Sequence, residues 1–136
     1  MRQVTRFAHA AGAGYPSRMP PLTVFHNPAC SKSRRAVEIL RERGAAFDVV
    51  EYLKHPPSRA TLEQLVATPG IVPGELVRRD RRFAELGLTD ADCATPAKVV
   101  DLLAAHPELM ERPVIVATGR AVIARPPEKA LDVLDA

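Results

Sequence analysis

Cys30 is the residue of this chain whose surroundings most favour chemistry. It follows the turn-forming pair Asn27-Pro28 and comes directly before a stretch with helical spacing. A thiol at the N-terminus of a helix faces unpaired backbone N–H groups and the positive end of the helix dipole, and both favour the thiolate. We therefore predict that Cys30 has a lowered pKa and acts as a nucleophile, rather than as an inert buried thiol.

The spacing around Cys30 excludes three well-known kinds of cysteine site. A Cys-x-x-Cys dithiol needs a second cysteine at position 33, where the chain has Ser33. A cysteine-phosphatase loop needs an arginine at position 36, where the chain has Ala36. The four histidines do not group with the two cysteines at zinc-finger spacing, so we expect no metal site. What remains is a single nucleophilic thiol whose resolving partner comes from elsewhere.

Cys93, the second cysteine, stands among polar and acidic neighbours. The carboxylates of Asp90 and Asp92 disfavour a nearby thiolate, so they should raise the pKa of Cys93. We therefore expect Cys93 to be a bystander that lies at the surface or is half-buried.

The elements around Cys30 follow from short patterns. Residues 22–26 form a β-prone run that the Asn-Pro pair ends, which predicts a strand and a turn. Residues 31–43 carry apolar side chains at helical spacing, and Gly44 directly after them is a typical helix stop. Residues 46–52 predict a second strand. Strand, helix and strand in this order form a βαβ unit, whose two strands are parallel.

The remainder of the chain predicts a helical insert and then a hairpin. Ser58 is an expected N-cap for one helix and Thr95-Pro96 an expected N-cap and first residue for another, with short helical pieces between them. Residues 114–117 and 121–124 predict two strands of a hairpin, and a short helix follows Pro126-Pro127. The order β-α-β, helical insert, β-β-α indicates an α/β protein with a mixed sheet and a thioredoxin-like fold.

Length and composition limit the class of protein. The chain has 136 residues, enough for one domain, and 46% hydrophobic with 26% charged residues is ordinary for a globular protein. No apolar run reaches the length of a membrane span, and two cysteines are too few for a secreted disulfide framework. We therefore expect a soluble, cytoplasmic protein that does not bind a membrane.

The basic charge gathers at one end of the chain. The three arginines of residues 1–18 account for the whole formal net charge of +3, so the rest lacks the basic surface typical of a nucleic-acid-binding protein. Residues 1–18 also show no helical or strand periodicity. We expect them to be a disordered extension of a single domain over residues 19–136.

An ordered set of short motifs resembles one family. The loop His26-Asn-Pro-Ala-Cys-Ser-Lys-Ser-Arg34 is similar to the active-site loop of the glutaredoxin-dependent arsenate reductases, the ArsC family. The resemblance covers essentially all of residues 20–135. It continues through residues 52–58, 76–79, 85–88, 106–107, 112–116 and 125–126.

The resemblance implies an oxyanion site. In that family three arginines converge on the cysteine, and the matching positions here are Arg78, Arg112 and Arg125. Arsenate is a charged tetrahedral oxyanion that repels a thiolate. Guanidinium groups offset that repulsion and orient the oxygens through bidentate, charge-assisted hydrogen bonds.

The resemblance also implies supporting roles around Cys30. Ser33 is expected to hydrogen-bond the thiolate, His26 to influence its charge, and Asn27 to belong to the same loop. In thioredoxin-like folds a cis-proline before the third strand faces the catalytic cysteine, and Pro113 occupies that position here.

The implied reaction is the reduction of arsenate to arsenite. Cys30 forms a covalent adduct with arsenic, which glutathione as co-substrate and glutaredoxin as protein partner resolve, with no bound cofactor or metal. One alternative is a thiol–disulfide enzyme of the same fold with an empty oxyanion site, against which the three arginines argue. Another is a regulatory relative that binds RNA polymerase. Such relatives usually carry a Cys-x-x-Cys switch, which Ser33 replaces here.

Overall fold

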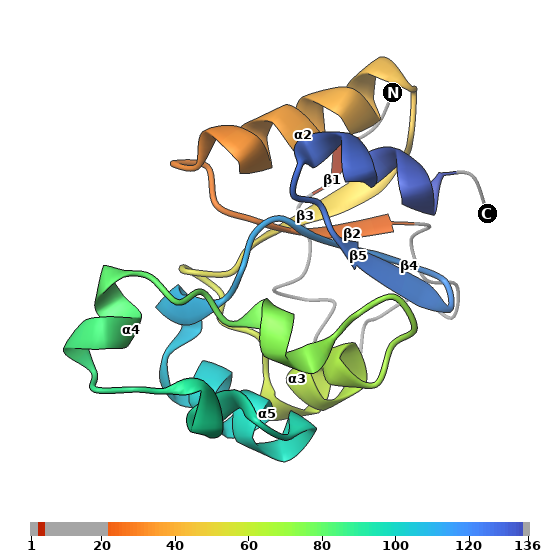
Figure 1. Ribbon diagram of the computed structural model, residues 1–136. Helices are drawn as coiled ribbons and strands as arrows, with labels where there is room; N and C mark the ends of the chain where they lie inside the picture. Colours follow the sequence, from red (N-terminus) through yellow and green to blue (C-terminus); the bar gives the residue numbers. More distant parts are fainter. Residues whose placement is uncertain (1–2, 5–21, 135–136) are drawn as a thin grey trace.

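The computed structural model describes residues 3–4 and 22–134, and its centre is a five-stranded mixed sheet (Figure 1). The spatial order of the strands is β1-β3-β2-β4-β5. Their bounds are β1 Gln3–Val4, β2 Leu22–His26, β3 Phe47–Glu51, β4 Val114–Ala117 and β5 Arg120–Ile123. Strand β3 is parallel to β1 and β2, whereas β4 is antiparallel to β2 and β5. The βαβ unit, the hairpin and the mixed sheet predicted from the sequence are confirmed.

Helices cover both faces of this sheet (Figure 1). Helix α2 and the C-terminal 3₁₀ helix pack together on one face, and the helical insert covers the other. The α-helices are α2 Ser31–Glu42, α3 Arg59–Val66, α4 Arg81–Glu85 and α5 Pro96–Ala105. The 3₁₀ helices are η1 Pro73–Leu76, η2 Asp90–Cys93, η3 Pro107–Leu109 and η4 Pro127–Val133. This arrangement is the thioredoxin-like fold with helices inserted between β3 and β4.

Side-chain caps begin three of the α-helices. Ser58 accepts a hydrogen bond from the Thr61 N–H at the start of α3, and Thr95 accepts one from the Lys98 N–H at the start of α5. Both caps were predicted. Asp80 caps α4 in the same way, and a cap of this kind contributes about 1 kcal/mol.

Strand β1 was not predicted. The sequence pattern of residues 1–18 indicates no strand, yet the backbone of Gln3–Val4 pairs in parallel with Phe47 and Asp48 of β3. So short a strand depends on the free edge that β3 offers to its backbone, and side-chain periodicity does not reveal it. The rest of the predicted disordered extension lies outside the described residues and stays a prediction.

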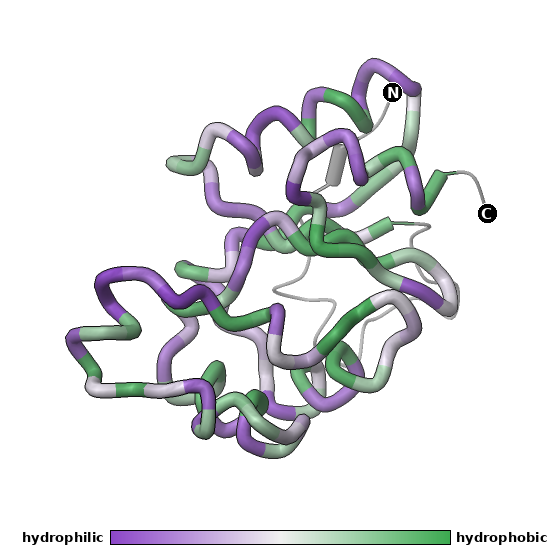
Figure 2. Tube along the Cα trace, viewed as in Figure 1, coloured by the Kyte–Doolittle hydropathy of each residue, from purple (hydrophilic) through white to green (hydrophobic). Residues whose placement is uncertain are grey.

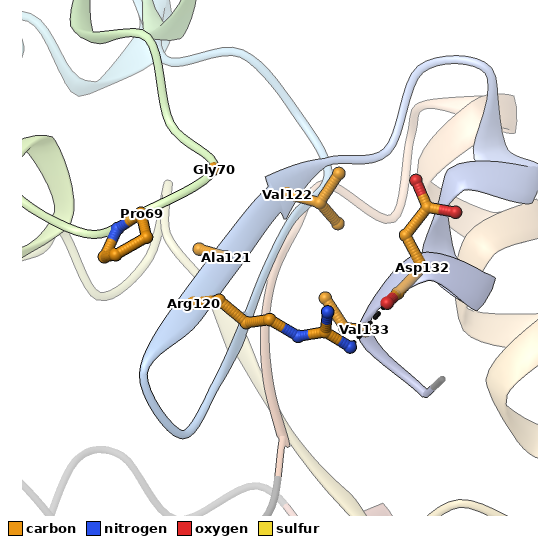
Figure 3. Close-up of a pocket in the computed structure, with 7 residues that line it drawn as sticks. All are labelled: Pro69, Gly70, Arg120, Ala121, Val122, Asp132 and Val133. Atoms are coloured by element: carbon orange, nitrogen blue, oxygen red, sulfur yellow. Dashed lines mark hydrogen bonds between the residues drawn. The ribbon is translucent and has the colours of Figure 1, made fainter. Parts of the chain in front are cut away.

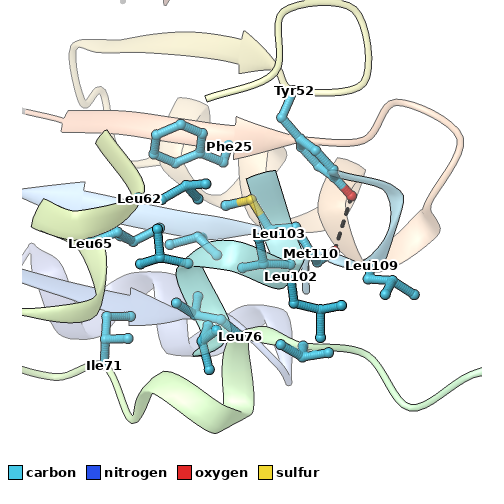
Figure 4. Close-up of a cluster of buried hydrophobic side chains, with 14 of the residues drawn as sticks. Phe25, Tyr52, Leu62, Leu65, Ile71, Leu76, Leu102, Leu103, Leu109 and Met110 are labelled. Carbon is cyan, nitrogen blue, oxygen red and sulfur yellow. Dashed lines mark hydrogen bonds between the residues drawn. The ribbon is translucent and has the colours of Figure 1, made fainter. Parts of the chain in front are cut away.

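The sheet separates two hydrophobic cores. The core beneath α2 and η4 contains Val24, Leu40 and Ile115 among its fully buried members. Hydrophobic residues dominate β4 and β5 and alternate with hydrophilic ones along α2, as an amphipathic helix requires (Figure 2). The core on the other face joins the sheet to α3 and α5, and Leu62 and Leu103 meet there (Figure 4).

Tyr52 links that second core to the loop before β4. Its ring is fully buried, and its hydroxyl donates a 3.3 Å hydrogen bond to the carbonyl of Met110 (Figure 4). Met110 precedes Arg112 by two residues, so this bond helps to hold the segment that carries a predicted site residue.

A surface hollow of about 380 Å³ lies elsewhere, between β5, the end of η4 and the loop at Gly70 (Figure 3). Gly70 has a φ of +96°, and a Cβ there would lie 2.1 Å from the carbonyl oxygen of Ala121. A side chain at position 70 is therefore excluded both by its clash with the Ala121 backbone and by the positive φ. None of the site residues predicted from the sequence lines this hollow.

Candidate active site

Cys30 lies between β2 and α2, at the N-cap position of the helix. Its own N–H donates to the Asn27 carbonyl at 3.0 Å, which closes the turn made by Asn27-Pro28. Its carbonyl accepts the Arg34 N–H at 3.0 Å, which is the first turn of α2. The turn therefore places the thiol where the first N–H groups of the helix are unpaired.

The pKa of Cys30 is lowered, as predicted. Partial burial acts to raise it, but the backbone N–H groups of Ser33 and Lys32 and the side chains of Arg112 and Arg125 together outweigh burial. The result is a pKa of about 7, against an ordinary value of 9.0. About half of the thiol is therefore in the reactive thiolate form at neutral pH.

Two of the three predicted arginines approach the thiol directly. Nη1 of Arg125 lies 3.9 Å from the Cys30 sulfur and donates to the Arg112 carbonyl at 2.9 Å. Nε of Arg112 is buried and has no hydrogen-bond partner among the described residues. An unpaired guanidinium donor beside a thiolate is suited to receive an oxygen of a bound anion.

Arg78 reaches the same place through an interaction between two loops. Its N–H donates to the Leu109 carbonyl, and the N–H of Glu111 donates to the Leu76 carbonyl. This short antiparallel contact centres on a bridge between Val77 and Met110. It places Arg78 opposite Leu109 and Leu76 opposite Glu111, and the Arg78 side chain then reaches the Glu111 carboxylate, next to Arg112.

Glu111 is the site residue that the sequence did not indicate. Its Oε1 accepts a hydrogen bond of 2.8 Å from Arg78 Nη1 and lies 3.7 Å from Arg125 Nε. The backbone N–H of Arg112 lies 3.4 Å from the same oxygen. One carboxylate thus contacts all three arginine positions. The only signal in the sequence is its place directly before Arg112, which by itself distinguishes it from no other surface glutamate.

The supporting residues form a buried chain behind the thiol. His26 Nδ1 lies 2.7 Å from the Ser33 hydroxyl, and the Asn27 N–H donates to that hydroxyl at 3.0 Å. Asn27 Oδ1 accepts the Ala29 N–H at 2.9 Å and so fixes the turn. The Ser33 hydroxyl is therefore occupied by His26 and Asn27, and Ser33 influences Cys30 through its backbone N–H.

The imidazole of His26 favours its neutral form. Burial lowers its pKa below 6.5, Glu51 acts to raise it, and Arg41 and Arg34 lower it further. A neutral ring can accept the Ser33 proton at Nδ1 while the Ser33 oxygen accepts from Asn27. At neutral pH His26 therefore orients Ser33 and adds no positive charge beside Cys30.

Pro113 stands directly before β4, and the Arg112–Pro113 peptide bond is cis. The Arg125–Pro126 peptide bond is cis as well, which the sequence did not indicate. In both cases the residue before the proline is an arginine of the site.

Cys93 differs from its prediction in one respect. It is buried in the core beside α5, not exposed or half-buried, because η2 turns its side chain inward. Its pKa is raised, as predicted, chiefly by burial, with Asp92 and Asp90 acting in the same direction against Arg79. A buried thiol with a raised pKa is poorly reactive.

Within residues 3–4 and 22–134, no three histidine, cysteine or acidic side chains gather in a way that could hold a metal ion. The same residues include no helix long and apolar enough to cross a membrane.

Comparisons with known proteins agree with this geometry. The chain is 41% identical over 114 residues to an arsenate reductase of Rhizobium meliloti, covering 83% of this chain and 81% of the relative. It is 40% identical over 118 residues to an arsenate reductase of Neisseria meningitidis, covering 85% of this chain and all of the relative. The solved structure of an arsenate reductase from Vibrio cholerae superposes with a TM-score of 0.73 at 33% identity, over 85% of this chain and 99% of that one. The model of the ArsC family matches residues 25–133. The chain therefore belongs to the ArsC family.

Proposed function

We propose that this protein is an arsenate reductase, an oxidoreductase that converts arsenate to arsenite. The observation that carries the proposal is a Cys30 thiol with a pKa of about 7, approached by the guanidinium groups of Arg112 and Arg125. A nucleophile and a set of anion-binding donors thus meet at one point. The arsenate reductases of Rhizobium meliloti and Neisseria meningitidis, to which the chain is similar, support the choice of anion.

The first step joins the substrate to the protein. The Cys30 thiolate attacks arsenic in dihydrogen arsenate, an S–As bond forms, an As–O bond breaks, and hydroxide leaves. Arsenic stays in the +5 state, so no electrons are transferred at this point. Arg112 and Arg125 hold the oxygens, and their fixed charges offset the repulsion between thiolate and anion. Arg78 favours the product state.

Reduction then needs thiols from other molecules, because Ser33 stands where a resolving cysteine would be. Glutathione attacks the adduct, which forms a second S–As bond and releases a further hydroxide. A glutaredoxin thiolate attacks the glutathione sulfur, an S–S bond forms, and the electron pair of the broken S–As bond remains on arsenic as As(III). Water then releases arsenite and restores Cys30.

This scheme defines the partners of the protein. In this scheme arsenate is the substrate, glutathione the co-substrate and glutaredoxin the protein partner, and the reaction needs no bound cofactor, metal or nucleic acid. The cytoplasm is the matching location, since its glutathione pool is kept reduced.

The test is arsenate-dependent oxidation of NADPH in the presence of glutathione, glutaredoxin and glutathione reductase. We expect turnover for the wild type and for Cys93→Ala, and none for Cys30→Ser. Omission of glutaredoxin should also abolish it. A folded wild-type protein with a reactive Cys30 but no arsenate-dependent turnover would contradict the proposal and favour a thiol–disulfide enzyme or a regulatory relative.

A further inference from the structure

Glu111 places a negative charge among the three arginines of the site. Its Oε1 lies 2.8 Å from Arg78 Nη1, 3.7 Å from Arg125 Nε and 3.4 Å from the Arg112 N–H. The Glu111 side chain is 20% exposed, so water screens this charge only in part. An anion that engages the arginines must therefore come close to a carboxylate.

The contacts leave one carboxylate oxygen available. All three converge on Oε1, and no residue in the described part of the chain donates a hydrogen bond to Oε2. An ionised carboxylate only accepts hydrogen bonds. A group that reaches Oε2 must bring its own proton, because two acceptor oxygens placed together repel each other and leave both unpaired.

Tetrahedral oxyanions differ in this property. Arsenate and phosphate keep at least one hydroxyl group at neutral pH, whereas sulfate keeps none. We propose that Glu111 is a specificity-determining residue, whose Oε2 accepts a hydrogen bond from a hydroxyl of the bound anion and thereby selects protonated tetrahedral oxyanions over sulfate. This inference rests on the proposed function and deepens it, since it defines the class of anion that the site accepts. The site rejects sulfate because sulfate has no hydroxyl group that could donate a hydrogen bond to Oε2.

The test measures anion binding without turnover. Phosphate and sulfate are the probes, because thiols reduce neither of them at this site. Each is titrated at pH 7 and constant ionic strength against the rate at which iodoacetamide alkylates Cys30, followed by mass spectrometry. Protection of Cys30 gives an apparent Kd for each anion, and the ratio of the two is the specificity. The proteins are the wild type, Glu111→Gln and Asp80→Asn.

Asp80→Asn is a matched control. Asp80 also pairs with Arg78, at 3.3 Å from Nε, and its change to asparagine removes the same charge. Asparagine caps a helix as well as aspartate, so α4 should keep its start. Asp80 differs from Glu111 in having no contact with Arg125 or Arg112.

We expect the wild type to bind phosphate in preference to sulfate. Glu111→Gln should reduce this preference about tenfold or more, because its amide N–H can donate to sulfate, and Asp80→Asn should leave it unchanged. If Glu111→Gln bound both anions more tightly by the same factor, the carboxylate would act through its charge alone. If it bound both more weakly by the same factor, Glu111 would only position the arginines. Either result overturns the inference and leaves the oxyanion site intact. Failure of both anions to protect Cys30 in any variant would instead refute the oxyanion site, and with it the proposed function.

Discussion

Replacing Arg125 by glutamine should raise the pKa of Cys30. Nη1 of Arg125 lies 3.9 Å from the sulfur. A pair of charges at this distance interacts by about 1 kcal/mol in bulk water and about 4 kcal/mol near a protein surface. Glu111 offsets part of the Arg125 charge, so we take an interaction energy between Arg125 and the thiolate of about 1.4 kcal/mol, near the lower of these two values. This energy corresponds to a shift of about one unit in the pKa of Cys30.

The sign follows from which form is charged. The thiolate loses a neighbouring cation, so the neutral thiol gains and the pKa rises from about 7 to about 8. The thiolate fraction at pH 7 then falls from about half to about a tenth. The pKa should stay below 9.0, because the N–H groups of Ser33 and Lys32 and the side chain of Arg112 remain.

The assay is the pH dependence of the iodoacetamide rate at Cys30. Arg59→Gln, which removes an equal charge from a surface pair with Asp101, serves as the control and should leave the profile unchanged. Well above pH 9 both thiols are ionised, and Arg125→Gln should then react at least as fast as the wild type, because a thiolate of higher pKa is the stronger nucleophile. An unchanged midpoint in Arg125→Gln would refute the reasoning, since it would mean that the backbone N–H groups alone lower the pKa.

Three further predictions concern stability, each measured by chemical denaturation. Ser33→Ala should lower the free energy of unfolding by about 1–3 kcal/mol, because it leaves buried hydrogen-bonding groups at His26 unpaired; a cost below that of a surface substitution would contradict it. Gly70→Ala should destabilise by more than Gly44→Ala, since both have positive φ but only position 70 would drive a Cβ against the Ala121 carbonyl; equal costs would count against the close approach. The pKa of His26 is lower in the folded state than its ordinary value, so its contribution to stability is present above pH 6.5 and is lost as pH falls through the folded pKa. His26→Gln should remove that part of the acid dependence, and an identical pH profile in the variant would refute this assignment.

Many elements could be predicted because their determinants are close in the sequence. The turn at Asn27-Pro28 and the helix after it follow from residue types within a few positions, and so do the caps at Ser58 and Thr95. The hairpin of β4 and β5 likewise depends on a short turn. Strand β1 could not be found in this way, since its pairing depends on a backbone edge supplied by β3.

In the candidate site, too, features with local determinants could be predicted and features that depend on the fold could not. The reactivity of Cys30 was predictable in direction, because the N–H groups of Lys32 and Ser33 belong to the helix that follows it. The positions of the arginines were suggested only by family resemblance, since nothing local separates Arg78 from Arg79. Burial of Cys93 was missed because its neighbours in the sequence are polar, whereas its neighbours in space are apolar.

The sequence by itself determined the position of the low-pKa thiol, the order of the elements from β2 onward and the fold. Hydrogen bonds within turns and helices and the periodicity of apolar residues act over a few positions, so their effects can be predicted from the sequence. Tertiary structure alone decided which charges meet the thiol. Antiparallel pairing of β2 with β4 brings the segment after Arg112 beside the strand that ends before Cys30, and Arg125 reaches the sulfur from 95 residues away. The contact of residues 76–78 with 109–111 turns Glu111 into the common partner of the arginines. Electrostatic interactions of this kind depend on distance in space, which becomes defined only when the sheet and both cores are assembled.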